Sequence, residues 1–273
     1  WAYYFLSQIF VIIAFIVVYK FSEEIFNNKN LALFSVLLLE GIYFYNFTTP
    51  EFNVNICQLP FWSLTVYFAW KIFNSKKINF YDCIYLAVFA SIGFLSKYLF
   101  IYLLISIFLL FVYQINILKE RKFDFKYLIS LEIFLVLLVP HIIWLFNNEF
   151  ITIKYAFFRA GLSETNYINH LKFPVIFLIK QIFIILPSLT LLYFLLKKIK
   201  IKLEKKDQKL IFLLFINFLP ILLIFLTSFV TGSKIRTMWM TPFYLFFGTL
   251  MIYVCQNYLD YNKVKNFLIC FLL

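Results

Sequence analysis

Long apolar stretches alternate with short polar ones along almost the whole chain. The stretches are roughly 16–23 residues long, and apolar and polar residues do not alternate within them as they do in barrel strands. A helix of about 20 residues crosses roughly 30 Å of hydrocarbon. The pattern therefore predicts an all-α fold, a polytopic integral membrane bundle of about nine to ten transmembrane helices. We expect them near residues 3–19, 31–46, 58–74, 80–96, 98–117, 127–146, 174–196, 210–229, 238–256 and 267 to the end.

One junction between these stretches needs a separate argument. Residues 80–118 contain no polar loop, although about 40 residues are twice the length of one span. The break in this stretch is residues 93–98, GFLSKY. We predict a tight helical hairpin there.

Composition and charge support a membrane protein and argue against a nucleic-acid-binding protein. Hydrophobic residues make up 64% of the chain, more than a soluble core of 273 residues could bury, and the net charge is +12. If Trp1 lies outside and the spans alternate, 18 of the 25 basic residues fall on inner loops, as the positive-inside rule requires. Those loops carry the basic residues of segments 20–29, 71–77, 119–126, 197–209 and 263–265. Most of the charge thus reflects topology and contact with anionic membrane lipids.

Seven basic residues remain on the outer half and break that rule. Cations at the outer interface, beside aromatic side chains, suit a phosphate group held at headgroup depth. These residues are Lys97, Lys154, Arg159, Lys172, Lys180, Lys234 and Arg236.

The sequence contains no motif for a metal site, a disulfide framework or a nucleotide-binding loop. The four cysteines are scattered and form no CxxC pair, so we interpret them as small apolar residues. We expect residues 1–273 to form a single transmembrane domain. Because the sequence starts at Trp1 and stops inside the apolar run FLICFLL, we expect a piece of a longer chain.

Four segments together resemble a known family. In chain order they are TTPEFNVNICQLPFWSLTVYFAWK, GFLSKY, PHIIWLFNNEFITIKYAFFRAG and HLKFPVIFLIKQ. They are similar to bacterial members of the membrane-embedded GT-C glycosyltransferases, in particular the family 39-like group. That group is related to protein O-mannosyltransferases and to the aminoarabinose transferases of lipid A. The resemblance runs from about Trp1 to Tyr253.

The resemblance implies a GT-C-like fold and a specific reaction. Such enzymes transfer a sugar from a polyprenyl-phosphate donor to a lipid, glycan or protein acceptor, with inversion, at the outer face of the bacterial inner membrane. A divalent metal assists some members, and the sequence leaves open whether this chain uses one. The resemblance places the catalytic Asp in a loop before Trp1. The four Asp of this chain, all expected on the inner side, are Asp82, Asp124, Asp207 and Asp260.

Glu51 is the candidate catalytic carboxylate within this chain. It lies in a polar outer loop beside Asn53 and Asn55, whose amides are suited to sugar hydroxyls, and a carboxylate can accept the acceptor proton. The alternative is a solvated turn, with Thr49 as helix N-cap and Pro50 in the first helical position.

The predicted hairpin and the following helix supply three further candidate substrate-binding residues. We expect Lys97 either to contact the donor phosphate or to extend its amine to the membrane interface. We expect Tyr98 to stack on a sugar or to form a hydrogen bond with it. His141 is close to Pro140, which predicts a kink, so it is either a site residue or a structural one.

The last candidates are two pairs in later outer segments. Tyr155 and Arg159 are four residues apart and share a face if the segment is helical, and Arg suits bidentate phosphate binding. Lys234 and Arg236 follow in TGSKIRTMWMTP, where they hold the donor phosphate or anchor the chain at the interface.

The rival function is a transporter or flippase for a lipid-linked or anionic solute. It would also gather cations, but it predicts inverted repeats and broken helices rich in Gly and Pro. The chain has 5 Gly and no repeat that we can find. A purely structural membrane subunit does not account for the polar outer loops. The sequence thus favours the glycosyltransferase.

Overall fold

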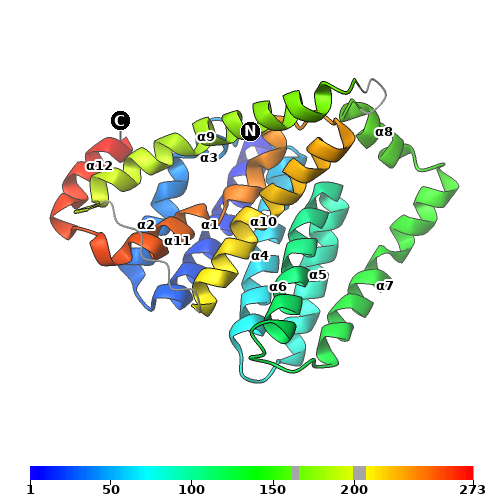
Figure 1. Ribbon diagram of the computed structural model, residues 1–273, viewed down its shortest axis with the longest axis horizontal. Helices are drawn as coiled ribbons and strands as arrows, with labels where there is room; N and C mark the ends of the chain where they lie inside the picture. Colours follow the sequence, from blue (N-terminus) through cyan, green and yellow to red (C-terminus); the bar gives the residue numbers. More distant parts are fainter. Residues whose placement is uncertain (162–165, 199–206, 273) are drawn as a thin grey trace.

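The computed structural model describes residues 1–161, 166–198 and 207–272, and in these residues the regular elements are helices (Figure 1). The long helices are α1 (Ala2–Phe26), α4 (Val54–Asn74), α5 (Phe80–Ser96), α6 (Ile101–Asn116), α7 (Lys126–Asn147), α9 (Asn169–Leu195) and α10 (Gln208–Thr231). The shorter ones are α2 (Lys29–Glu40), α3 (Tyr43–Asn46), α8 (Ile151–Arg159), α11 (Phe247–Cys255) and α12 (Val264–Leu272). Short 3₁₀ helices are η1 (Tyr98–Phe100), η2 (Thr237–Tyr244), η3 (Gln256–Tyr258) and η4 (Tyr261–Lys263). The all-α prediction is confirmed for this part of the chain.

Polar side chains set the starts of several helices. The side chain of Asn28 accepts hydrogen bonds from the amides of Asn30 and Leu31 at the start of α2. Asn79 caps α5 and Asp207 caps α10 in the same way. These contacts satisfy amides that the first helical turn cannot pair, which is why the apolar helices begin where they do.

The polar loop before α4 differs from the sequence prediction. Thr49 does not cap a helix: its hydroxyl donates to the carbonyl of Tyr45, four residues earlier, and closes the turn after α3. The N-cap of α4 is Asn53, whose side chain accepts from the amides of Asn55 and Ile56. The prediction of Thr49 as N-cap was wrong because a threonine hydroxyl can serve the preceding turn as readily as the following one.

The core forms where α1, α4, α6, α10 and α11 meet. Its largest buried side chains are aromatic: Phe21 of α1 contacts Trp70 of α4 and Phe246, and Phe212 of α10 packs on the same ring of Trp70. Edge-to-face and tilted arrangements of such rings add to the apolar burial. This core holds the two halves of the sequence together.

The number of helices able to span a membrane is smaller than the sequence predicted. Within the described residues five helices have the length and apolarity, namely α1, Tyr98–Asn116, α7, α9 and α10. A sixth is possible if the segments Thr237–Tyr244 and Phe247–Tyr258, bent by 51°, form one broken span. The expected span at 31–46 is the 12-residue α2, about 18 Å long, and α5 has 17 residues. The count of nine to ten stays a prediction.

The predicted hairpin at GFLSKY is confirmed. Helix α5 ends at Ser96, the chain reverses, and η1 leads into α6 (Figure 1). Phe100 packs directly on Gly93, seven residues earlier; in a straight helix the two would be about 10 Å apart. A Cβ at Gly93 would lie 2.2 Å from the ring of Phe100, so the reversal needs a residue without a side chain there.

Different helix ends and connections lie at the two edges of the bundle. In Figure 1 the upper edge holds the N-terminus, α8 and the end of α10, and the lower edge holds the α4–α5 and α6–α7 connections. These lower connections contain Lys76, Lys77, Lys119, Arg121 and Lys122, all residues for which the sequence predicts the inner side, and that side stays a prediction. Four more lysines of the expected inner loops lie outside the described residues: Lys200, Lys202, Lys205 and Lys206.

Candidate functional site

Lys97 connects three elements at the upper edge of the bundle. Its amine donates a hydrogen bond to the side-chain oxygen of Asn55, which is 5% exposed at the start of α4. The same amine lies 5.4 Å from the ring centroid of Trp239 in η2. Asn55 and Lys97, both predicted site residues, are thus brought together, and Trp239 completes a cation–π contact.

Within the described residues, no carboxylate forms an ion pair with Lys97. The ion pairs in the described part of the chain involve Lys71 and Lys154 instead. Lys97 lies between the apolar helices Phe80–Ser96 and Tyr98–Asn116, and burial lowers its pKa to about 7. An anion placed beside this amine would favour its charged form, so the position suits a phosphate.

Tyr98 is the centre of a second set of contacts. Its hydroxyl lies 2.8 Å from Nε2 of His141 on α7 and 2.7 Å from the hydroxyl of Thr152 on α8. The ring of His141 stacks on Trp144, with centroids 5.7 Å apart. The structure therefore brings together Tyr98 and His141 as predicted and adds Thr152, which the sequence analysis missed. In the segment ITIKY, Thr152 lies between two isoleucines, and that was the available signal.

A third set of contacts gathers the later basic residues. On α8 the guanidinium of Arg159 lies 5.7 Å from the ring centroid of Tyr155, so the predicted shared face is confirmed. The backbone amide of Lys234 donates to the carbonyl of Ala160, 2.9 Å away, which fixes the loop after α10 against the end of α8. Nδ1 of His170 lies 3.0 Å from the carbonyl of Phe229, which joins the start of α9 to the same place.

These three sets lie along one edge rather than in one enclosed cavity. Thr152 and Arg159 are seven residues apart on α8, or about 10 Å. Lys97 and Tyr98 are adjacent and join the first two sets. The side chains of Lys234 and Arg236 are exposed beside them. The edge thus gathers cations and hydroxyls from the hairpin, α8 and the loop after α10.

Glu51 and Asn53 have more limited contacts than the sequence suggested. Glu51 is exposed in a bend, and within the described residues its carboxylate has no ion pair. The amide of Asn53 donates to the backbone carbonyl of Glu51 while its oxygen caps α4, so this side chain is already used by the helix start. Neither contact tests a catalytic role for Glu51, which stays a prediction.

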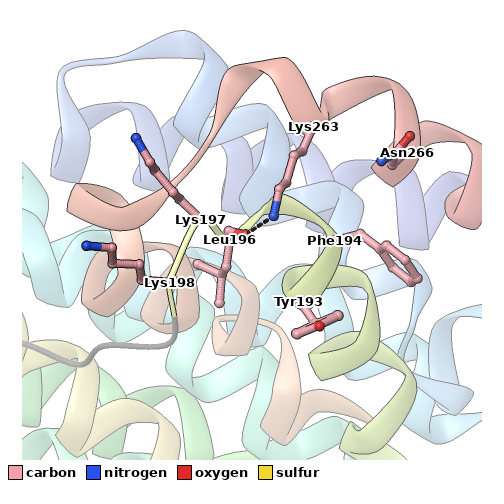
Figure 2. Close-up of a pocket in the computed structure, with 7 residues that line it drawn as sticks. All are labelled: Tyr193, Phe194, Leu196, Lys197, Lys198, Lys263 and Asn266. Carbon is pink, nitrogen blue, oxygen red and sulfur yellow. Dashed lines mark hydrogen bonds between the residues drawn. The ribbon is translucent and has the colours of Figure 1, made fainter.

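No group of three or more His, Cys, Asp or Glu that could hold a metal occurs in residues 1–161, 166–198 and 207–272. Two pockets lie elsewhere in the described part of the chain. One, of about 310 Å³, lies between the end of α9 and α12; Figure 2 shows Lys263 donating to the carbonyl of Leu196, with Lys197 and Lys198 extending to the other side. The other, of about 370 Å³, lies between the α4–α5 and α6–α7 connections.

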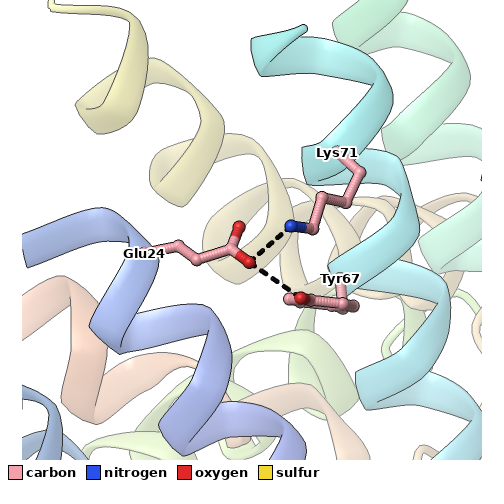
Figure 3. Close-up of polar contacts among 3 residues, drawn as sticks. All are labelled: Glu24, Tyr67 and Lys71. Carbon is pink, nitrogen blue, oxygen red and sulfur yellow. Dashed lines mark hydrogen bonds and ion pairs between the residues drawn. The ribbon is translucent and has the colours of Figure 1, made fainter. Parts of the chain in front are cut away.

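Polar contacts at the lower ends of α1 and α4 are structural in character. Figure 3 shows one oxygen of Glu24 accepting from the amine of Lys71 and, at 2.7 Å, from the hydroxyl of Tyr67. Lys71 also lies over the ring of Tyr67. These three side chains join α1 to α4 at the end opposite Asn55.

Comparison with known proteins identifies the family. The family model of the dolichyl-phosphate-mannose-protein mannosyltransferases matches residues 1–144, more than half of the chain. The chain belongs to this family. It is therefore a membrane glycosyltransferase with several apolar helices, and membership implies a lipid-linked sugar donor. The matched part contains Asn55, Lys97, Tyr98 and His141. Searches of curated proteins and of solved structures gave no significant match.

Proposed function

We propose that this protein transfers a sugar from a polyprenyl-phosphate donor to a lipid, glycan or protein acceptor at the outer face of a bacterial inner membrane. The observation that carries the proposal is the family match, which implies the donor class. The placement of the basic residues supports the side. The α4–α5 and α6–α7 connections, whose basic residues are expected inside, lie at the edge of the bundle opposite α8 and the end of α10 (Figure 1).

The donor phosphate binds along the edge formed by the start of α4, the hairpin, α8 and the loop after α10. Lys97, Arg159, Lys234 and Arg236 face the phosphate as it departs with the lipid. Its negative charge grows in the transition state, so pooled cations stabilise that state more than the ground state. Tyr98 and His141 contact the sugar, with Tyr155 beside Arg159 at the rim.

The finer parts of the proposal rest on the resemblance and on chemistry. The first is that the sugar is transferred by inverting displacement. The second is that the catalytic Asp comes from the loop that precedes Trp1 in the family pattern. The third is that Glu51, Asn53 and Asn55 shape the acceptor side of the site. Nine to ten spans and a single domain over residues 1–273 also belong to this proposal.

Substitution of Arg159 tests the phosphate assignment. Arg159→Ala should lower turnover of a polyprenyl-phosphate sugar by at least tenfold while membrane insertion is retained, since a charge-assisted hydrogen bond contributes about 1.5–3 kcal/mol. The matched control is Lys265→Ala, which removes an exposed cation of α12 that belongs to the basic residues expected inside and should leave turnover unchanged. Release of polyprenyl phosphate from a labelled donor in proteoliposomes is the measurement. Equal turnover in wild type and Arg159→Ala would exclude the role of Arg159.

The same proteoliposomes separate the enzyme from the transporter. A glycosyltransferase releases polyprenyl phosphate, whereas a flippase moves the intact lipid-linked sugar between leaflets. Movement of intact donor without release would contradict the proposed function.

A further inference from the structure

A second polar cavity lies at the edge opposite the candidate site. It has a volume of about 370 Å³ and is lined by Lys76, Ile78, Arg121, Lys122, Phe123, Asp124 and Phe125. These residues come from the connections α4–α5 and α6–α7. Helix α4 runs from Asn55 to this cavity, and its 21 residues span about 30 Å, so the cavity is separated from the donor edge by the thickness of a bilayer core.

Side-chain hydrogen bonds hold the walls of the cavity in place, and Arg121 makes two of them. One nitrogen of this guanidinium donates to the carbonyl of Ile72 at the end of α4, 2.7 Å away, and approaches the hydroxyl of Tyr127 at 3.4 Å. Lys126 donates to the carbonyl of Ile78, 2.8 Å away, and so joins the two connections from the other side. The walls are thus held by side-chain contacts to backbone carbonyls.

The charged residues that line the cavity are mainly basic, and some of their charged groups have no polar partner within the described residues. Lys76 and Lys122 are exposed and make no polar contact within the described residues. The one acidic lining residue, Asp124, already accepts a hydrogen bond from the amide of Lys126. Two free ammonium groups and part of a guanidinium therefore remain for an anion, and phosphate oxygens suit such donors.

The surroundings of the cavity are those of a lipid–water interface. Phe123 is 53% exposed and Phe125 77% exposed on its rim. The next element, α7, has only Leu138 and Leu145 buried, and it exposes Leu128, Leu131 and Leu135. An occupant with a phosphate and an apolar tail can place the phosphate in the cavity and the tail along α7. A free phosphate would use only the first of these features.

We propose that this cavity binds the headgroup of an anionic phospholipid from the leaflet opposite the sugar-transfer site. Lys76 and Lys122 contact the phosphate, Arg121 positions the wall, and Phe123 and Phe125 contact the first acyl carbons. The site is separate from the donor edge and does not depend on the proposed transfer reaction.

Lipid binding to charge variants tests this proposal. The full chain in mixed micelles is titrated with phosphatidylglycerol or phosphatidylcholine, and bound lipid is counted by native mass spectrometry. We expect wild type to retain phosphatidylglycerol preferentially. Lys76→Gln with Lys122→Gln should weaken this retention by roughly tenfold, since each lysine near an anionic lipid contributes to binding. Lys76→Arg with Lys122→Arg should preserve it, which separates loss of charge from loss of fold.

The matched control removes two lysines from the same edge but outside the cavity. Lys20→Gln with Lys29→Gln changes exposed residues around the α1–α2 connection and should leave retention unchanged. An equal loss in both glutamine variants would mean diffuse attraction and would overturn the proposal. So would displacement of the bound lipid by excess inorganic phosphate, which would identify a phosphate site with no need for acyl chains.

Discussion

The hydroxyl of Tyr98 offers the sharpest test of how the candidate site is held together. It bridges α7 and α8 through His141 and Thr152, at 2.8 and 2.7 Å. Helix α8 has no buried side chain, so few apolar contacts hold it against the rest of the bundle. The hydrogen bond from the phenol of Tyr98 to Thr152 therefore contributes to keeping α8 in place.

Tyr98→Phe removes one oxygen and both hydrogen bonds while keeping the ring. Each neutral hydrogen bond contributes about 0.5–1.5 kcal/mol, so the variant should lose roughly 1–3 kcal/mol in the free energy of local opening. Since 1.4 kcal/mol corresponds to a factor of ten, amide exchange over residues 151–159 should rise by roughly tenfold. Exchange in the core helices α1 and α4 should stay unchanged because they do not contact this phenol.

A double-mutant cycle with Thr152→Val isolates the Tyr98–Thr152 contact. Valine keeps the shape of threonine and loses its hydroxyl, so the coupling energy should be about 0.5–1.5 kcal/mol. Tyr155→Phe is the matched control, because Tyr155 is exposed and its hydroxyl has no hydrogen bond within the described residues. The measurement is hydrogen–deuterium exchange in detergent. A coupling below about 0.3 kcal/mol, or the same rise in exchange for Tyr155→Phe, would refute the reasoning.

Three further outcomes are expected. Gly93→Ala should destabilise the protein by about 1–3 kcal/mol, because the added Cβ meets the buried ring of Phe100. The loss should appear as a lower thermal midpoint, and adding Phe100→Leu should restore part of it. An unchanged midpoint for Gly93→Ala would contradict the packing. Glu24→Gln should change the free energy of unfolding by only about 0–1 kcal/mol, since Glu24 and Lys71 are 33% and 38% exposed, and a larger loss in denaturant titration would mean a less solvated pair. The ammonium form of Lys97 is present below a pKa of about 7 and lost above it, so affinity for the donor should fall as pH rises through 7. Lys97→Arg, which stays charged, should remove that dependence, and an identical pH profile in both would count against a phosphate contact.

The sequence by itself determined that this is a membrane protein built of helices. Apolar runs of helical length dictate helices because lipid offers no partner for backbone groups. The bias of basic residues predicted which connections share an edge, and the break at GFLSKY predicted the reversal that Gly93 and Phe100 form. The segments around Asn55, Lys97 and His141 pointed to the family that the comparison later identified.

Only the tertiary structure decided which of the predicted residues meet. Asn55 and Lys97 are 42 residues apart, and Tyr98 and Thr152 are 54 apart, so no local spacing reveals their contacts. The same holds for Thr49, whose hydroxyl could serve either neighbouring turn and in the fold serves the earlier one. The length of a span is likewise a property of the folded chain, because a run such as 31–46 can end as a helix too short to cross a bilayer. Pairing between distant side chains depends on how whole helices pack, and helix packing is set by the buried aromatic core rather than by any one motif.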